Sequence, residues 1–281
     1  MDACEFYRAI APYYDADYAA RYQGRDIRFY VDLAVECGGP VLEMGCGTGR
    51  ILLPTARAGI PIHGLDLSGE MLAELRKALS REPADVQQRV SLAEGDIRSA
   101  FAGCGFALVT APFRVVQHLL TRQDQRAWLR NAARHLAPGG ALCFDVFQPD
   151  FSLLAAPRGP ETELERDDPA TGLRLRRIMR TRPRAALQLQ EVHIEWRLEA
   201  SDGTPVSTSS ASLLIRWYTR GELENLLELE GFEITDYWGS FEREPFGEGS
   251  QEQIIRAVLS SGGSQSPVGS RQSAVGNRWG S

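Results

Sequence analysis

The stretch Val41-Leu42-Glu43-Met44-Gly45-Cys46-Gly47-Thr48-Gly49-Arg50 decides the fold. Its first four residues are apolar apart from the carboxylate of Glu43, glycines follow at three alternate positions, and Ile51-Leu52-Leu53 begins a helical pattern. Glycine is favoured where the backbone takes a positive φ or where a ligand comes close. Backbone N–H groups at a helix start also attract anions. The stretch therefore predicts a strand, a tight ligand-binding turn and a helix.

Two classes of ligand use such a turn, and Glu43 separates them. A dinucleotide fingerprint reads G-x-G-x-x-G, whereas here the third glycine, Gly49, comes one place early. A pyrophosphate would meet the like charge of Glu43, but the ammonium and sulfonium of S-adenosylmethionine (SAM) would be attracted to it. We then expect the methionine carboxylate of SAM on the amides of the turn. A nicotinamide-dependent oxidoreductase and a structural turn without ligand are the alternatives.

Two further acids stand where predicted strands end. Asp66 closes the apolar run 60–66 and lies 21 residues after Gly45, close to the offset of about 20 at which an acid binds ribose hydroxyls. Asp96 follows the run 90–95 and is placed to accept a hydrogen bond from an adenine amine. The carboxyl ends of parallel strands share one edge of a sheet, so these acids are expected beside the glycine turn.

Four motifs together resemble those of class I SAM-dependent methyltransferases: Glu43-x-Gly45-x-Gly47-x-Gly49, Gly64-Leu65-Asp66, Glu94-Gly95-Asp96 and Leu136-Ala137-Pro138-Gly139-Gly140. The resemblance implies an α/β fold with a doubly wound, seven-stranded, mostly parallel Rossmann-like sheet, and it implies SAM as the cofactor. The residues that it places on the cofactor are Glu43, Gly45, Cys46, Gly47, Gly49, Asp66, Leu67, Met71, Asp96, Ile97, Pro112 and Phe113.

Composition sets outer bounds on the function. The chain has 281 residues, 43% of them apolar and 24% charged, and a net charge of −6. The negative charge argues against nucleic acid as a partner. No apolar run approaches the length of a transmembrane helix, and the N-terminus lacks the features of a secretory signal. Five scattered cysteines indicate reduced thiols, no metal site and a cytoplasmic location.

The pattern along the chain predicts three parts. Residues 1–37 form a helical lid rich in tyrosine, residues 38–259 form the methyltransferase domain, and residues 260–281 are a disordered tail because they are poor in apolar side chains. Within the domain, strand and helix patterns alternate up to residue 146. Residues 170–218 then change to a period of two, which predicts an inserted antiparallel sheet.

Details of the insertion and of its exit follow from local patterns. A change of apolar phase predicts a β-bulge near Gln190-Glu191. Thr219 and Glu222 predict a capping box at the start of a helix. The apolar face that carries Trp196 and Trp217 must cover something, either a substrate cavity or a second copy of the chain in a homodimer.

The segment 110–119 lies where a methyl acceptor should enter. His118 is the candidate base for an amine or hydroxyl acceptor. The chain is most similar to bacterial small-molecule methyltransferases, including amino-sugar N,N-dimethyltransferases, and this resemblance implies catalytic roles for Tyr14, Tyr18 and His118 and substrate contacts from Gln117, Tyr18 and Trp217. Arg177, Arg180 and Arg182 are expected to form a solvated strand face rather than an anion site.

The sequence therefore predicts a SAM-dependent methyltransferase that acts on a small molecule, with an amine acceptor ahead of a hydroxyl. An RNA or protein methyltransferase and a SAM-binding protein without turnover are the alternatives. Methyl transfer from a sulfonium depends mainly on alignment and exclusion of water, so the sequence carries no strong catalytic signature to separate them.

Overall fold

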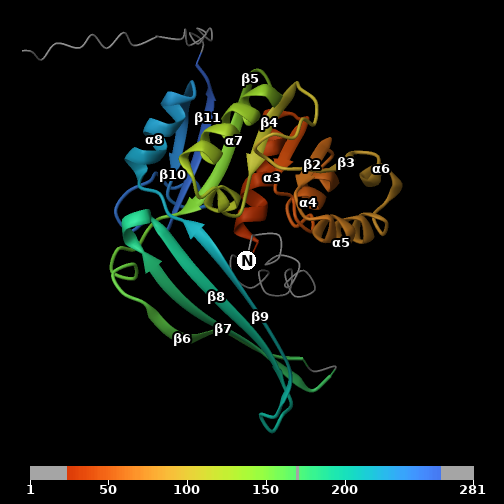
Figure 1. Cartoon of the computed structure of the whole chain (residues 1–281). Helices are drawn as coiled ribbons and strands as arrows, with labels where there is room; N and C mark the ends of the chain where they lie inside the picture. The colour runs from red at the N-terminus through yellow and green to blue at the C-terminus, as the bar shows by residue number, and fades with distance from the viewer. Residues whose placement is uncertain (1–23, 169–170, 261–281) are drawn as a thin grey trace, which may run out of the picture.

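The computed structural model describes residues 24–168 and 171–260. Its main sheet has the predicted seven strands in the order β10-β11-β5-β4-β1-β2-β3 (Figure 1). Strands β1 to β5 run parallel, and β11 pairs antiparallel with both β5 and β10. The strands of this sheet are β1 (Val41–Met44), β2 (Ile62–Asp66), β3 (Val90–Glu94), β4 (Phe106–Ala111), β5 (Leu136–Phe147), β10 (Phe232–Trp238) and β11 (Glu252–Leu259).

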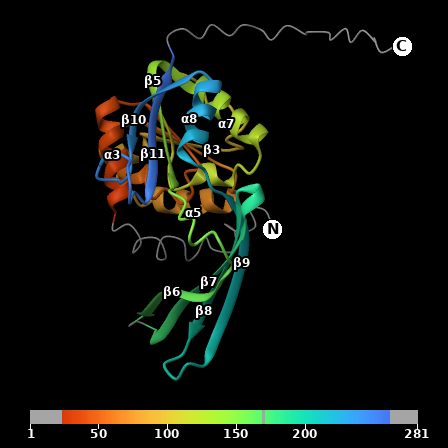
Figure 2. The same ribbon diagram turned by 90° about the vertical axis from the view of Figure 1, so that its left-hand side faces the viewer.

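Helices cover both faces of this sheet, because alternate strand residues point to opposite faces. One apolar core packs α3, α4 and α5 against one face, and a second packs α7 and α8 against the other (Figure 2). The α-helical and 3₁₀ (η) segments are α3 (Arg25–Cys37), α4 (Leu52–Arg57), α5 (Gly69–Leu79), α6 (Ala84–Gln87), η1 (Val115–His118), α7 (Arg122–His135), η2 (Ala185–Leu187) and α8 (Arg220–Leu229).

The predicted lid and tail are described only in part. Tyr14 and Tyr18 lie outside the described residues, as does the tail from residue 261. Helix α3 falls within the predicted lid, yet it buries Phe29, Tyr30 and Leu33 in the core of the main domain.

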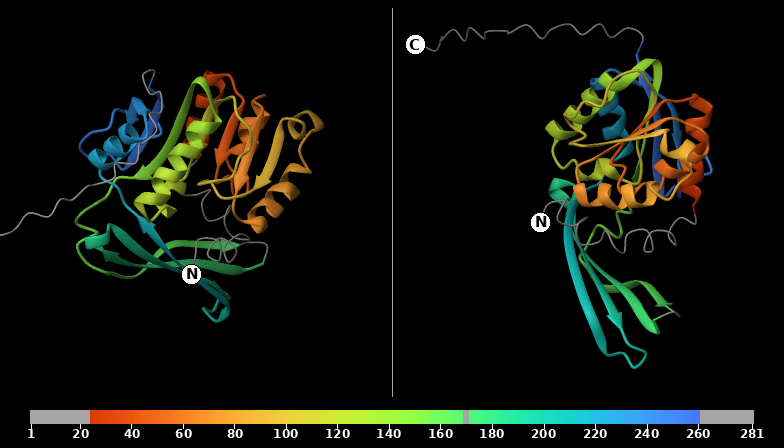
Figure 3. Two further views of the ribbon diagram at one scale, coloured as in Figure 1. Left: turned by 45° about the horizontal axis from the view of Figure 1, so that its top comes forward. Right: turned by 90° about the vertical axis from the view of Figure 1, so that its right-hand side faces the viewer.

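The predicted insertion is a separate four-stranded antiparallel sheet beyond the carboxyl ends of the main strands (Figure 3). Strand β6 begins well before the predicted start at residue 170, and it was missed because its sequence is almost wholly polar. The strands of this second sheet are β6 (Arg158–Asp168), β7 (Leu173–Arg184), β8 (Leu189–Glu199) and β9 (Pro205–Arg216).

Two local predictions about this region were wrong. Pairing of β8 with both neighbours is continuous through Gln190 and Glu191, so no bulge lies there. Of the two leucines that gave the earlier apolar phase, Leu187 belongs to η2 and precedes the strand, and Leu189 is its first residue. Thr219 starts α8 without a side-chain cap. Glu222 instead accepts hydrogen bonds from Arg216 at 2.6 Å and from Gln188 at 2.8 Å, which ties α8 to the second sheet.

Two general features bear on function. Within residues 24–168 and 171–260, no helix has the length and apolar character needed to cross a membrane. In the same ranges, no group of three or more His, Cys, Asp and Glu side chains is arranged to hold a metal ion.

Candidate functional site

The glycine turn after β1 is held by the neighbouring strand β2. The N–H groups of Gly45 and Cys46 donate to the carbonyl of Leu65, at 2.7 and 3.2 Å. Gly45, Gly47 and Gly49 all take positive φ values, which only glycine adopts at little cost. The turn therefore has the predicted shape, and the amides of Gly45 and Cys46 already have a partner inside the protein.

Asp66, at the end of β2, braces the turn. Its Oδ2 accepts the N–H of Gly47 at 2.7 Å, and its Oδ1 accepts the N–H of Ser68 at 2.9 Å. Burial raises the pKa of this carboxyl group. Each carboxylate oxygen has a second lone pair, so Asp66 retains the capacity to accept the two hydroxyls of a ribose.

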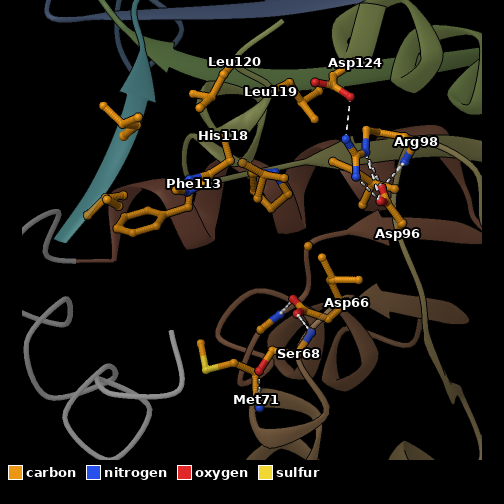
Figure 4. A pocket seen from close by; sticks show the side chains of 18 of the residues that line it. Asp66, Ser68, Met71, Asp96, Arg98, Phe113, His118, Leu119, Leu120 and Asp124 are labelled. Atoms are coloured by element: carbon orange, nitrogen blue, oxygen red, sulfur yellow. Dashed lines mark hydrogen bonds and ion pairs between the residues drawn. The ribbon is translucent and has the colours of Figure 1, made fainter. Parts of the chain in front are cut away.

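A cavity of about 500 Å³ opens beside the turn, at the carboxyl ends of the parallel strands. Figure 4 shows Asp66, Ser68 and Met71 on one side of it and Phe113, His118 and Leu119 on the other. The predicted cofactor residues that line it are Gly45, Gly47, Asp66, Leu67, Met71, Asp96, Ile97, Pro112 and Phe113. Residues that sequence reasoning missed also line it, namely Ser68, Arg98, Val115, Leu119, Leu120, Thr121, Asp124, Leu213 and Leu214.

The far end of this cavity carries a charged cluster. Arg98 binds Asp96 with Nη2 2.5 Å from Oδ2, and it also binds Asp124 through Nη1 at 2.5 Å (Figure 4). The Arg98 hydrogen bond holds the pKa of Asp96 below its usual range. Counting Asp66 as well, carboxylates outnumber the one guanidinium among the lining side chains, and a cation-bearing ligand suits such a wall.

Glu43 lies behind the turn rather than in the cavity wall. It is 2% exposed, and burial raises its pKa to about 8, although Arg50 opposes this rise. Its Oε2 has no hydrogen-bond partner within the described part of the chain. A buried carboxyl oxygen without a partner costs free energy, so an ammonium nearby would stabilise the ionised form. Glu43 fits the cofactor on this ground.

The opposite wall of the cavity is a strained segment held by Asp145 at the end of β5. Phe113 and Arg114 have φ values of 60° and 65°, which residues other than glycine rarely adopt. Asp145 accepts the N–H of Phe113 at 2.7 Å and that of Arg114 at 3.0 Å. The Arg50 guanidinium lies 4.5 Å from the centroid of the Phe113 ring. These contacts fix Phe113 in the wall of the cavity.

His118 stands at the end of η1, behind Phe113. Burial lowers its pKa to about 4, so the imidazole is neutral at physiological pH. The segment is fastened by Tyr218, whose hydroxyl donates to the carbonyls of Val116 and Leu119 at 3.1 and 3.2 Å. Sequence reasoning placed His118 here from its position after β4, but not this state of ionisation.

A second cavity, of about 270 Å³, lies between η1 and the inner face of the four-stranded sheet. Phe113, His118 and Leu213 line both cavities, so the two spaces meet at these side chains. The apolar face of the inserted sheet therefore covers a cavity in this structure.

Besides Glu43, four predicted site residues lie outside both cavities. Gln117 is buried, and its side-chain amide is hydrogen-bonded to main chain at both atoms. The nitrogen donates to the carbonyl of Arg216 at 2.7 Å, and the oxygen accepts the N–H of Phe147 at 3.2 Å. It therefore braces the fold. Trp217 packs edge-to-face on Phe151, with 5.7 Å between the ring centroids. Cys46 and Gly49 lie within the turn and are absent from the lining of either cavity.

Comparisons with known proteins agree with this geometry. Residues 41–140 match a family described as a methyltransferase domain. A relative, the cypemycin N-terminal methyltransferase of a Streptomyces species, is 28% identical over 78% of this chain and 82% of its own length. Another, the dTDP-3-amino-3,4,6-trideoxy-alpha-D-glucopyranose N,N-dimethyltransferase of Streptomyces venezuelae, is 32% identical over 45% of this chain and 49% of its own length.

A solved structure shares the fold of nearly the whole chain. SAM-bound CalS10 from Micromonospora echinaspora, an amino pentose methyltransferase, is 25% identical, covers 86% of this chain and 96% of its own, and has a TM-score of 0.64. In a doubly wound sheet, ligands bind outside the carboxyl ends of the strands, where the glycine turn and the acids of this chain lie. The fold, the site and these similarities together make the chain a SAM-dependent methyltransferase, and SAM is its cofactor.

Proposed function

We propose that this enzyme transfers a methyl group from SAM to the amine of a small molecule that occupies the second cavity. The observation that carries the proposal is the meeting of two cavities at Phe113, His118 and Leu213. A cofactor in one space and an acceptor in the other would face each other across that junction, which is the geometry that an in-line displacement requires.

The residues around the larger cavity suit SAM, and bound SAM supplies a methyl group activated by its sulfonium. Asp66 would hold the ribose, Asp96 the adenine amine, and Glu43 the ammonium. Met71 and Phe113 provide apolar walls that exclude water from the junction.

His118 is the proposed contact to the acceptor. Because its pKa lies near 4, it is too weak a base to remove a proton from an ammonium ion, but a neutral imidazole accepts hydrogen bonds. An amine that donates an N–H to His118 would hold its lone pair in a fixed direction. This revises the expectation that His118 is a general base and gives it the role of orienting the acceptor.

An amine is favoured over a hydroxyl for two reasons. An unprotonated amine needs no base, and of the three residues that the two cavities share, Phe113, His118 and Leu213, only His118 can titrate. The names of two relatives also favour nitrogen, since one is a cypemycin N-terminal methyltransferase and the other an N,N-dimethyltransferase of a dTDP-linked amino sugar. The second cavity accounts for the apolar face of the inserted sheet without a second copy of the chain.

A direct test incubates the enzyme with SAM and a panel of small amines, each paired with the alcohol of the same skeleton. We expect release of S-adenosylhomocysteine with amines and a product 14 mass units heavier, with the methyl on nitrogen by NMR. Methylation of the alcohols alone would contradict the proposal. Asp66→Asn should weaken SAM binding about tenfold or more in calorimetry, whereas Asp85→Asn, an exposed acid paired with Arg89, should not.

A further inference from the structure

The lining of the second cavity indicates the chemistry of the molecule that it would bind. One side is the inner face of the inserted sheet, with Met179, Val192, Ile194, Leu213 and Ile215. Other apolar side chains close it from the main domain and from the segment after β5, namely Phe113, Phe147, Leu153 and Leu154. These surfaces would bury an apolar body and gain free energy in proportion to the area removed from water.

The arginines of this cavity are neutralised by carboxylates. Arg177 is 4% exposed and binds Glu163. A β-bulge makes this pair possible, because the register of β6 against β7 shifts between Thr162 and Leu164, and the extra residue, Glu163, reaches the inner face. Sequence analysis grouped Arg177 with Arg180 and Arg182. On β7, however, Arg177 points to the inner face together with the alternate residues Met179 and Thr181, whereas Arg180 and Arg182 point outward.

The other two arginines are paired in the same way. Arg114 binds Glu252 at 2.8 Å, and Arg158 binds Glu161 at 2.5 Å. Each of these arginines is paired with a glutamate that is not itself part of the lining, so the three pairs carry no net charge, and Asp150 adds one negative charge. A diphosphate would therefore bring at least two negative charges to described walls that offer no net positive charge.

Thr181 and Gln148 each bring a buried polar atom to this cavity. Thr181 is 6% exposed, and its hydroxyl has no hydrogen-bond partner in the ranges that the structure describes. The side-chain oxygen of Gln148 is in the same position. Buried polar groups are nearly always hydrogen-bonded, so we expect both atoms to form hydrogen bonds with polar groups of the bound molecule.

We propose, on the basis of the amine methylation proposed above, that the second cavity binds a small amine with an apolar body and no phosphate, which carries a hydroxyl or carbonyl group that pairs with Thr181. Amines linked to a nucleoside diphosphate are excluded from it. The proposal rests on the apolar lining, on the three neutralised arginines and on the two polar atoms without partners.

The test compares three amines as acceptors by their KM in methyl transfer and by calorimetry with the enzyme saturated with S-adenosylhomocysteine. The probes are trans-4-aminocyclohexanol, cyclohexylamine and a dTDP-linked amino sugar. We expect the aminocyclohexanol to bind best and the nucleotide-linked amine to bind at least about tenfold more weakly. Thr181→Val should raise the KM of aminocyclohexanol about three- to tenfold and leave that of cyclohexylamine within about twofold. Thr208→Val, on the exposed outer face, is the control.

A second pair of variants tests the charge argument. Glu163→Gln leaves the charge of Arg177 uncompensated and should improve binding of 4-aminocyclohexyl phosphate by about threefold or more. Glu165→Gln is the matched control, because Glu165 binds Arg174 and Arg176 on the outer face, and it should change nothing.

The outcomes separate this inference from the proposed function. Methylation of the nucleotide-linked amine with a lower KM than the phosphate-free amines overturns the acceptor class but leaves amine methylation standing. Equal effects of Thr181→Val on both cyclohexyl amines overturn the contact with Thr181. Binding and turnover of none of the amines, with SAM bound normally, overturn both proposals.

Discussion

The carboxylate of Asp145 accepts a hydrogen bond from the hydroxyl of Tyr30, with 2.6 Å between the two oxygens. Both side chains are almost fully buried, and the same carboxylate holds the N–H groups of Phe113 and Arg114. One buried anion thus links helix α3, strand β5 and the wall between the two cavities. Burial raises the pKa of Asp145 to about 6, so it is ionised at pH 8 and mostly protonated at pH 5.

Tyr30→Phe should destabilise the protein more at pH 8 than at pH 5. The folded pKa of Asp145 lies above its unfolded value, so this group's contribution to stability falls as pH rises from about 4 to 6, and the Tyr30 hydrogen bond offsets part of that fall. A hydrogen bond to a charged acceptor contributes about 1.5–3 kcal/mol and one to a neutral acceptor about 0.5–1.5 kcal/mol. Urea unfolding at the two pH values measures the difference.

The control for this prediction is Tyr237→Phe. Tyr237 donates to the amide oxygen of Gln253 at 2.5 Å, which does not titrate, so its removal should cost the same free energy at both pH values. A loss for Tyr30→Phe that does not change with pH would show that Asp145 is ionised throughout, and the argument from burial would then fail.

The sequence predicted the main sheet because its patterns are local: apolar runs that end in an acid, glycines at fixed spacing and a period of two. Strand β6 carries almost no apolar residues, so its place is set by pairing with β7 and not by its own pattern. The Thr219 and Glu222 pair fits a capping box, but Arg216 from β9 competes for the carboxylate.

For the site, too, local spacing was predictable from the sequence and tertiary contacts were not. Spacing identified Asp66 and Asp96, but not that Asp66 would take the amide of Gly47, since that depends on how β1 aligns with β2. Leu213 and Thr181 reach the cavities from the inserted sheet. Their contribution depends on how the inserted sheet packs against the main domain, which no local sequence pattern encodes.

Gly47 and Gly49 of the turn should differ in how well they tolerate a side chain. A Cβ at Gly49 would lie 2.3 Å from Leu75 Cδ1, at a φ of 88°, whereas a Cβ at Gly47 would meet only Met71 Cε at 3.5 Å. Gly49→Ala should therefore lower the free energy of unfolding by about 2–5 kcal/mol, through overpacking and backbone strain. Gly47→Ala should cost about 1–2 kcal/mol, from the backbone alone.

Cofactor binding should show the opposite order. Gly47 lines the larger cavity and Gly49 does not, so Gly47→Ala should weaken SAM binding at temperatures where both variants are folded. Thermal unfolding and calorimetry measure the two effects. A Gly47 variant less stable than the Gly49 variant would show that the turn is packed differently from this arrangement.

Binding of SAM should release a proton through Glu43. With a pKa of about 8, Glu43 is mostly protonated at pH 7 without ligand, and an ammonium beside it would favour the ionised form. Calorimetric enthalpies measured in phosphate and in Tris should then differ at pH 7. They should agree for Glu43→Gln. Equal enthalpies for the parent at pH 7 would remove Glu43 from the cofactor site.

The same shift predicts how stability depends on pH. The folded pKa of Glu43 is raised above its usual value, so the native state keeps a proton that the unfolded chain has lost between about pH 4.5 and pH 8, and stability falls across this window. Glu43→Gln cannot titrate. The difference in melting temperature between this variant and the parent should therefore move in favour of the variant as pH rises from 5 to 8.

His118→Ala should lower kcat by the same factor at every pH from 6.5 to 9, because a neutral imidazole with a pKa near 4 does not titrate in this range. Loss of an orienting hydrogen bond at the junction should reduce kcat about tenfold or more, while SAM affinity stays within a few-fold. His118→Gln, which keeps a hydrogen-bond acceptor, should recover part of the rate. His63→Ala, a half-exposed histidine bonded to Ser91, should have no effect. If the loss instead grows as pH falls, His118 takes a proton from the acceptor and acts as a base.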